Sequence, residues 1–296
     1  MTRPDGDTDL FEAHRPRLVR LAYRMLGSML EAEDIVQDAW LRWRRADRDT
    51  LATPGAYLTR IVTRLCLDVL KSARARRETY IGPWLPEPIV EPEDDALRAD
   101  EVTLTLMLAL ERLSPLERAA FLLHDVFDVP LGEVAATLDR APAAVRQLAA
   151  RARKHVRDGR PRYDVSRAEG ARIAQAFFTA STKGDLAELR GLLAENVVIL
   201  SDGGGKVVAF RNPIIGLDRA LRLFAGLSRK FADKMPDDIQ PAWINGLPGY
   251  ISQGRGDVLQ TTALEIENGR ITAVYITRNP DKLGRIAGFL DGTTVP

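Results

Sequence analysis

The sequence predicts a multidomain protein in which two all-α units precede an α+β unit shaped as a cone-like barrel. Apolar residues recur at helical spacing through roughly the first half of the 296-residue chain. After residue 164, short runs of β-branched and apolar residues are separated by Gly, Asn and Pro, as in strands joined by turns. A chain of this length is also expected to form two or three compact units with ordinary cores.

The first helical unit is predicted over residues 8–78. Ser28 and Glu31 form a capping box, which predicts a helix carrying the apolar residues from Ile35 to Trp43. Thr53 followed by Pro54 predicts the start of the next helix, with threonine as N-cap and proline at the first position. Cys66 lies in that helix and is expected to be a small packing residue.

A linker is predicted over residues 79–100, followed by a second helical unit over residues 101–160. The linker is proline-rich and acidic, with seven acidic residues against Arg98 between Glu87 and Glu101. In the second unit, two short helices, Leu131–Leu138 and Pro142–Arg157, are joined by three residues. This arrangement is typical of a helix-turn-helix.

The third unit is predicted over residues 164–296. Ser166 and Glu169 are expected to cap its first helix, and Asn268-Gly269 predicts a hairpin turn. Helices followed by an antiparallel meander are typical of a cone-shaped α+β barrel with an internal pocket. The expected strands are Val197–Leu200, Lys206–Phe210, Tyr250–Ser252, Val258–Ile266 and Ile271–Thr277.

The charge of the whole chain indicates no partner, but its distribution does. The net charge is +1, whereas residues 42–77 and residues 140–162 each carry +7. A basic run is often a solvated helix face, but its recurrence on two helical units is also the footprint of a phosphate-binding surface.

Several classes of protein are excluded by composition. A single cysteine excludes a disulfide framework, and three scattered histidines exclude a metal site built on a histidine or cysteine cluster. We therefore expect no metal and no cofactor. No apolar run approaches about 18 residues, and the first ten residues lack the apolar core of a signal peptide. The sequence thus favours a cytoplasmic protein without membrane contact.

The segment AYRMLGSMLEAEDIVQDAWLRWRR (residues 22–45) is followed by PGAYLTRIVTRLCLDVLKSARARR, the proline-rich linker and the arginine-rich helix-turn-helix. This order resembles a bacterial RNA polymerase sigma factor of the extracytoplasmic-function (ECF) type. The resemblance implies that the first unit binds core polymerase and the −10 element, and that the second binds the −35 element. The acidic helix face proposed for polymerase, which could also be an ordinary solvated face, comprises Glu33, Asp34, Gln37 and Asp38.

The same resemblance implies two DNA-binding surfaces. The loop 44–53 is expected to take in a flipped −10 base, and Arg60, Arg64, Lys71 and Arg74 are expected to follow the nearby phosphates. In the helix-turn-helix, the start of the second helix is expected to enter the major groove, unless the motif is only a structural hairpin. The expected −35 residues are Pro142, Ala143, Ala144, Arg146 and Gln147 near the bases, with Arg151, Arg153 and Lys154 at phosphates.

Three further motifs match the ECF subgroup that carries a SnoaL-like C-terminal extension. They are the linker Trp84, Leu85, Pro86, Glu87 and Pro88; the loop Asp202, Gly203, Gly204, Gly205 and Lys206; and Asn279, Pro280, Asp281, Lys282 and Leu283. The resemblance implies an internal regulator that packs on the sigma domains. Our hypothesis is that the linker meets the glycine loop and so fixes the spacing of the DNA-binding units. The loop is either an anion or carboxylate site built from amides near Lys206 or a flexible hairpin.

Other function classes remain open in the sequence. SnoaL-like domains include cyclases and isomerases, but residues 164–296 hold no histidine or cysteine, and the remaining acid–base groups show no pairing. We therefore expect no enzyme, although a pocket for a small apolar ligand stays open. The competing class is a one-component DNA-binding regulator or sensor enzyme that acts without polymerase. The acid–base groups are Asp202, Asp257, Glu265, Tyr250 and Tyr275.

Overall fold

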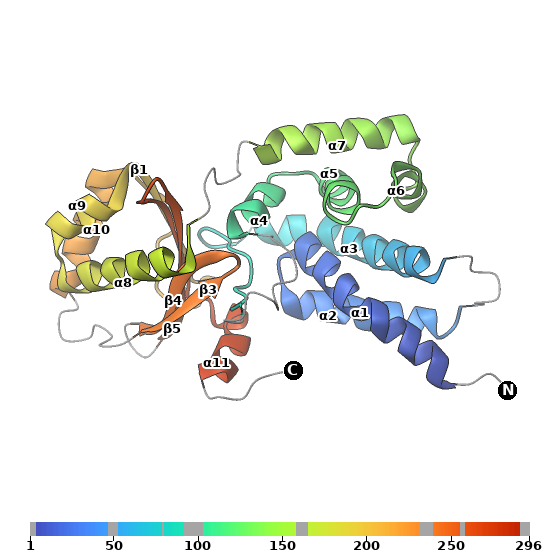
Figure 1. Ribbon diagram of the computed structural model, residues 1–296, viewed down its shortest axis with the longest axis horizontal. Coiled ribbons are helices and arrows are strands. Elements are labelled where there is room, and N and C mark those ends of the chain that lie inside the picture. Colours follow the sequence, from blue (N-terminus) through green and yellow to red (C-terminus); the bar gives the residue numbers. More distant parts are fainter. Residues whose placement is uncertain are drawn as a thin grey trace. The chain divides into compact units, whose positions relative to one another are not determined.

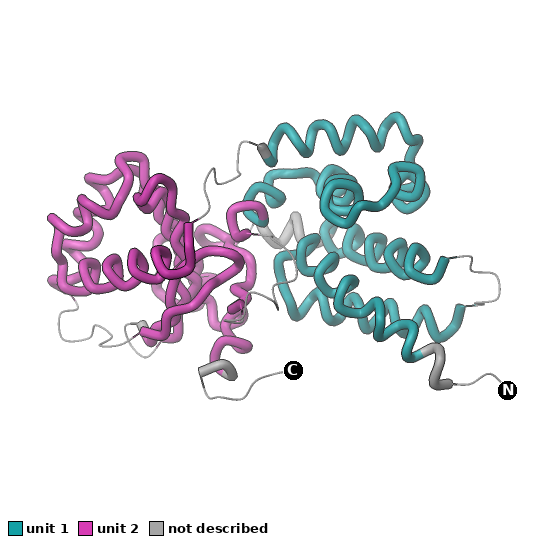
Figure 2. The backbone as a smooth tube through the Cα atoms, in the orientation of Figure 1, with its two compact units in different colours: residues 1–78, 107–159 teal, residues 79–106, 160–296 magenta. Residues whose placement is uncertain are grey.

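The computed structural model describes residues 4–46, 53–78, 80–91, 103–157, 165–230, 239–254 and 258–290. The chain forms two compact units, coloured separately in Figure 2. Unit 1 comprises residues 1–78 and 107–159, and unit 2 comprises residues 79–106 and 160–296. The linker therefore belongs to the same unit as the C-terminal domain. Among the helices described, none combines the length and apolar character needed to cross a bilayer.

Unit 1 is all helical, as expected, although residues 104–106 at the start of one helix fall in unit 2; the α-helices are labelled in Figure 1. Ser28 caps the second helix by accepting a hydrogen bond from the Glu31 amide at 3.3 Å. Ser114 and Glu117 form a complete capping box further along. The helices are α1 (Pro4–Leu26), α2 (Met29–Trp43), α3 (Pro54–Glu78), α4 (Leu104–Glu111), α5 (Pro115–Phe121), the π-helical turn η3 (Leu122–Val126), α6 (Leu131–Leu138) and α7 (Pro142–Arg157).

The core of unit 1 explains the helical spacing of its apolar residues. One face of each of the first three helices is buried, including Met25 of α1, Trp43 of α2 and Leu58 of α3. Cys66 is fully buried in the same core, where loss of water contact raises the pKa of its thiol. This burial agrees with a packing role for Cys66.

Unit 2 is an α+β domain with the linker attached. Its core includes the edge-to-face pair Phe177 and Phe224, which joins two helices over the sheet with ring centroids 5.5 Å apart. The elements are α8 (Arg167–Lys183), α9 (Leu186–Leu192), β1 (Leu193–Asp202), β2 (Ile214–Ile215), α10 (Leu217–Lys230), β3 (Gln240–Ile244), β4 (Leu247–Gly254), β5 (Val258–Glu267), β6 (Arg270–Thr277), the 3-10 turn η5 (Pro280–Lys282) and α11 (Gly284–Leu290).

The six strands lie in the order β2-β1-β6-β5-β4-β3. Strands β3 to β6 form the expected antiparallel meander, and β1 pairs in parallel with β6. Asn268 and Gly269 have φ of 51° and 74°, as expected for the turn between β5 and β6. The sheet is not closed in the part of the chain that the structure describes, because β2 and β3 stand at its two edges. The domain is α+β as predicted, with an open sheet.

One predicted strand is wrong and two strands were missed. Residues 206–210 form no strand, because the Lys206 and Val207 amides both donate to the Gly203 carbonyl and close a turn instead. Val208 in this segment is 85% exposed, so its apolar side chain does not indicate a buried strand. The missed strands are the two-residue β2 and the edge strand β3, whose Pro241 removes a strand signal.

Candidate functional site

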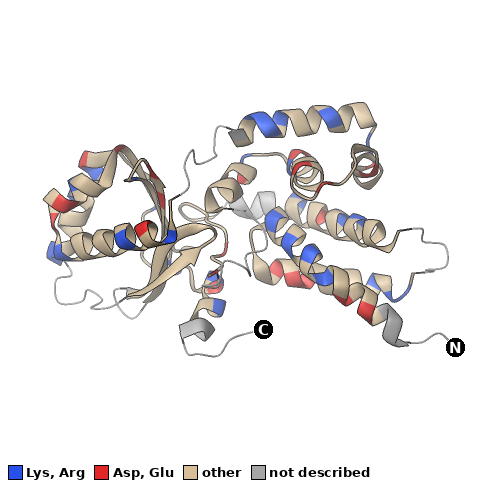
Figure 3. Ribbon diagram, in the orientation of Figure 1, with Lys and Arg blue, Asp and Glu red and all other residues tan. Residues whose placement is uncertain are grey.

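The acidic face of α2 has the one-sided character that the sequence predicts. Asp34, Gln37 and Asp38 are exposed and Glu33 is half-buried, while the opposite face of the helix is buried in the core of unit 1. Figure 3 shows the positions of acidic residues in red along the α2 ribbon. These side chains are therefore accessible to a basic partner surface.

The basic residues predicted for the −10 element lie along α3. Arg60, Arg64 and Lys71 are exposed. Lys71 pairs with Asp68 one turn away at 2.9 Å, and Arg64 Nε donates to the Thr137 carbonyl at 3.3 Å. Arg74 belongs to α3, but its side chain lies outside the described residues, as do residues 47–52 of the predicted base-capturing loop.

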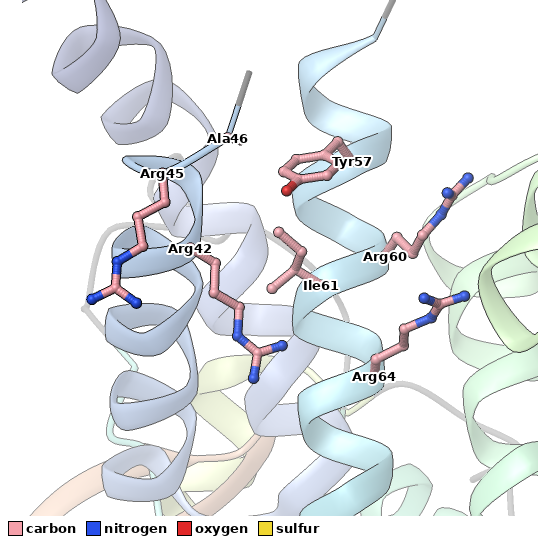
Figure 4. A pocket seen from close by; sticks show the side chains of 7 residues that line it. All are labelled: Arg42, Arg45, Ala46, Tyr57, Arg60, Ile61 and Arg64. Carbon is pink, nitrogen blue, oxygen red and sulfur yellow. The ribbon is translucent and has the colours of Figure 1, made fainter. Parts of the chain in front are cut away.

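An open pocket of about 470 Å³ lies between α2 and α3, beside the point where that loop begins. Arg42 comes from α2 and Arg45 from the turn that follows it, and Tyr57 faces them from α3, as Figure 4 shows. The centre of the Tyr57 ring lies 6.2 Å from that of the buried Trp43 ring, so Tyr57 adjoins the core of unit 1. The lining residues are Arg42, Arg45, Ala46, Tyr57, Arg60, Ile61 and Arg64.

The helix-turn-helix has the helix bounds that the sequence predicts. Asp139 adopts φ of 53°, a left-handed conformation that ends α6 and lets the chain turn into α7. Buried Val145 and Leu148 face the seam, whereas Arg146 and Gln147 are exposed. Of the remaining predicted −35 residues, Pro142, Ala143, Arg151 and Lys154 are exposed, and Ala144 and Arg153 are half-buried.

Two predicted phosphate ligands of α7 are engaged in ion pairs. Arg151 lies 2.8 Å from Glu117, and Arg153 lies 2.6 Å from Asp125. Partial burial opposes ionisation of Glu117, but hydrogen bonds from Ser114 and the pair with Arg151 outweigh it and lower the pKa of Glu117. A phosphate group would have to compete with these carboxylates for the two guanidinium groups.

A buried arginine joins the two helical parts of unit 1. Arg118 of α5 donates to the Met25 carbonyl at the end of α1 at 2.7 Å and to the Leu110 carbonyl at 3.0 Å. Its guanidinium also lies 2.7 Å from Glu111, and burial lowers the pKa of Arg118 to about 10. Sequence reasoning missed Arg118, because helical periodicity assigns an arginine to the solvent side.

In unit 2 the three sequence motifs converge on Asp202. The carboxylate is fully buried and accepts hydrogen bonds from the Tyr80 hydroxyl at 2.6 Å and the Leu85 amide at 2.9 Å. Lys282 completes the charge balance, with its Nζ 2.7 Å from Asp202 and its side chain only 11% exposed. We call these residues, together with Asn279, the Asp202 site.

The linker contributes more than a backbone amide to the Asp202 site. Lys282 also donates to the Leu85 carbonyl, and its Nζ lies 4.3 Å from the centre of the Trp84 ring. Asn279 donates to the Tyr80 hydroxyl at 3.0 Å. Burial and the hydrogen bond to Asp202 together raise the pKa of the Tyr80 phenol. The expected meeting of the linker and the glycine loop is therefore present in the structure.

The glycine loop is built differently from the predicted anion site. The Gly204 amide donates to Asp202 at 3.0 Å, and the Lys206 and Val207 amides donate to the Gly203 carbonyl. Gly204 has φ of 61°, and an added Cβ would lie 2.4 Å from the Asn279 side chain. The amides near Lys206 are thus used within the loop, and the Lys206 ammonium pairs with Asp281 on the surface.

The acid–base groups considered for catalysis have structural partners in unit 2. The Tyr275 hydroxyl donates to Glu265 at 2.6 Å between neighbouring strands. Burial raises the pKa of Glu265 despite this hydrogen bond, and burial raises the pKa of Tyr250 to about 12. Asp257 lies outside the described residues. Sequence reasoning did not find the pairing of Glu265 with Tyr275, because register is needed to bring them together.

Comparisons with known proteins agree with this division of the chain. Residues 10–76 match Sigma-70 region 2, and residues 103–156 match Sigma-70 region 4. The ECF RNA polymerase sigma factor SigJ of Mycobacterium tuberculosis is 38% identical over 287 residues, which cover 92% of this chain and 91% of SigJ. The chain belongs to the ECF RNA polymerase sigma factors.

Two further relatives support the whole-chain match of this sigma factor. The probable ECF RNA polymerase sigma factor SigI of M. tuberculosis is 33% identical and covers 99% of this chain and 100% of SigI. The crystal structure of M. tuberculosis SigJ superimposes with a TM-score of 0.75 at 36% identity, covering 93% of this chain and 98% of that structure. The similarity therefore includes the C-terminal α+β domain.

The matches assign the structural elements of this sigma factor to its regions. Helices α1–α3 belong to region 2, and α4–α7 belong to region 4. The pocket between α2 and α3 belongs to region 2 and includes Arg45 of the predicted base-capturing loop 44–53, but sequence reasoning missed Arg42 and Tyr57. The arginine density of residues 42–45 was the available signal for Arg42, whereas an aromatic residue within an apolar helical pattern gives no local sign that it lines a pocket.

Proposed function

We propose that this sigma factor binds core RNA polymerase, recognises −35 and −10 promoter elements and initiates transcription. The exposed face with Asp34, Gln37 and Asp38 would dock on polymerase. The start of α7, where Arg146 and Gln147 are exposed, would read bases in the major groove of the −35 element. Arg60 and Lys71 of α3 would meet phosphates near the −10 element.

We infer a role in base capture for the pocket between α2 and α3. An extruded base needs a flat surface for stacking and cations for its phosphates. Tyr57 supplies the aromatic ring, and Arg42 and Arg45 supply positive charge at the facing end of α2 and in the turn after it. A volume of about 470 Å³ is ample for one nucleotide base.

We propose that the C-terminal domain, which we regard as a SnoaL-like regulatory module without catalytic function, tunes this activity in cis. The observation that carries the proposal is the Asp202 site. A fully buried carboxylate and a nearly buried lysine bind the linker through the Tyr80 hydroxyl and both backbone groups of Leu85. Because this linker joins region 2 to region 4, a domain that holds it controls how far the two regions can separate.

The test is run-off transcription with core polymerase on promoters selected from DNA bound by the complex. The full-length chain is compared with Asp202→Ala, and Lys206→Ala serves as the matched control because its ion pair with Asp281 is exposed. Higher output from D202A identifies the domain as an inhibitor, and lost output identifies it as a spacer. Output equal to that of K206A would overturn control through the Asp202 site.

The same assay tests the sigma assignment itself. A full-length chain that copurifies with core polymerase and starts transcription supports it. A chain that binds promoter DNA but neither binds polymerase nor supports transcription would overturn it, and would favour a one-component regulator.

A further inference from the structure

A second linker contact lies at the turn between β3 and β4. Asn245 and Gly246 have φ of 48° and 74°, the geometry of a two-residue hairpin turn. Asn245 is only 5% exposed, although asparagines in such turns usually face water. The turn at Asn268-Gly269 has nearly the same backbone angles and is exposed. Something therefore covers the first turn and not the second.

The cover is the backbone of the linker. The Asn245 side-chain Oδ1 accepts a hydrogen bond from the Ile89 amide at 2.9 Å, and the Asn245 amide donates to the Ile89 carbonyl at 2.9 Å. The Asn245 carbonyl accepts from the Leu104 amide at 2.7 Å. One residue thus holds the chain both before and after residues 92–102.

Neighbouring contacts extend this site along the edge of the sheet. The Glu91 amide donates to the Trp243 carbonyl at 2.9 Å, and Val90 forms an antiparallel bridge with Ile244. The Val90 side chain packs against a cluster that includes Leu283. Residues 89–91 therefore add to the β3 edge as peptides add to an exposed strand.

The chain after the linker, at residues 103 and 104, also contacts this turn closely. An added Cβ on Gly246 would lie 3.0 Å from the Thr103 methyl group, and the Gly246 amide donates to the Glu91 carboxylate. Leu104, the first residue of α4, is 4% exposed. The positive φ and the close approach of Thr103 both require glycine at position 246.

We propose that the β3 edge and the Asn245-Gly246 turn form a docking site for both ends of the acidic linker segment, and that this site keeps the linker shortened. The proposal rests on the proposed function, because it assigns the site to the linker that joins regions 2 and 4. Its chemistry is that of strand addition: it binds backbone groups of an extended segment, with Glu91 providing an additional carboxylate.

The length of promoter DNA explains why shortening matters. Elements named −35 and −10 are centred about 25 base pairs apart, or about 85 Å along the duplex. The chain from residue 91 to residue 104 can span about 45 Å when extended. In the docked state both ends of this segment contact the same turn. Residues 91 and 104 are therefore held close together, and the linker does not extend to its full length. Release of the site returns this length to the linker and removes one restraint on the separation of regions 2 and 4.

The test is hydrogen exchange on the full-length protein with Asn245→Ala and the matched control Asn268→Ala. Both changes remove an asparagine at positive φ from the same kind of turn, but only Asn245 contacts the linker. We expect amide exchange at Ile89 and Leu104 to become about tenfold faster in N245A and to stay within about twofold in N268A. Unchanged protection in N245A would overturn the docking site.

A second variant changes the linker instead of the sheet domain, so that a distorted hairpin does not account for its effect. Ile89→Pro removes the donor from the linker side and leaves the hairpin intact. It should likewise speed exchange at Leu104, and unchanged exchange there in a folded I89P protein would again overturn docking.

Transcription separates this inference from the proposed function. N245A should raise run-off output about fivefold on a promoter with both elements, because about 1 kcal/mol of restraint is lost. Output equal to or below that of N268A would overturn the restraint. If the wild-type chain binds no core polymerase, the proposed function fails while the exchange result still decides whether the site binds the linker.

Discussion

Replacing Lys282 by methionine removes the cation from the Asp202 site while keeping a long apolar side chain of similar length. The Asp202 carboxylate would stay fully buried with its hydrogen bonds from Tyr80 and Leu85 but without a counter-charge. Removal of one partner from a buried ion pair typically costs about 3–5 kcal/mol, because the remaining charge has neither water nor a partner. In a unit of this size, that loss corresponds to a fall in Tm of about 10 °C.

A control for this prediction lies in the same two loops. Lys206 pairs with Asp281 at 2.5 Å, but the two side chains are 54% and 60% exposed. Water screens such a pair, so Lys206→Met should cost no more than about 1 kcal/mol. The double variant Asp202→Asn with Lys282→Met should recover part of the K282M loss, because it leaves no unpaired charge.

The assay is differential scanning calorimetry of the full-length chain, in which the transition of unit 2 is followed. Hydrogen exchange at the Leu85 amide reports the Asp202 site locally, since this amide donates to Asp202. A K282M transition within about 2 °C of that of K206M would refute the argument that burial makes the first pair strong.

Four other substitutions give distinct results. Gln147→Ala should weaken binding to the −35 element by about 1–3 kcal/mol and relax specificity at one base pair. Lys154→Ala should weaken binding to all DNA sequences alike and reduce the slope of log affinity against log salt concentration by about one. Binding titrations at several salt concentrations measure both effects. Glu265→Gln should become more stable relative to wild type as pH rises from 4 to 8 in urea unfolding. The reason is that the raised pKa of Glu265 provides stability below its unfolded value that is lost as pH rises through the folded value, and a flat difference would contradict this. Arg118→Met should lower the thermal transition of unit 1, because the Met25 carbonyl and Glu111 lose a buried partner; a transition unchanged from wild type would show that the buried arginine contributes little.

Much of the helical part could be predicted from local signals. The bounds of α6 and α7 match because proline starts α7 and Asp139 tolerates a left-handed turn, both of which are properties of single residues. The strand predicted over residues 206–210 is wrong because this segment begins in a turn closed by the Gly203 carbonyl and does not pair with another strand. Strand pairing depends on partners far along the chain, which periodicity does not reveal.

The functional sites were also predictable only in part from local sequence. The motifs indicated that the linker would meet Asp202, but they did not show that Lys282 supplies its counter-charge, since the two lie 80 residues apart. The burial of Arg118 and the docking role of Asn245 were also missed. Each depends on which surface covers the residue, and a polar residue under a tertiary contact has the same local sequence signal as one in water.

The order in which the chain passes between the two units constrains how the C-terminal domain could be lost in evolution. The chain changes unit after Glu78, Leu106 and Gly159, so the linker and the C-terminal domain share one interior although the helix-turn-helix separates them in the gene. A stop codon after α7 would therefore not release a simpler sigma factor. It would leave the backbone groups of Leu85 without Asp202 and Lys282, and the Leu104 amide without the Asn245 carbonyl. We expect a lineage that loses this domain to rewrite its linker as well, so that the two segments are kept or lost together.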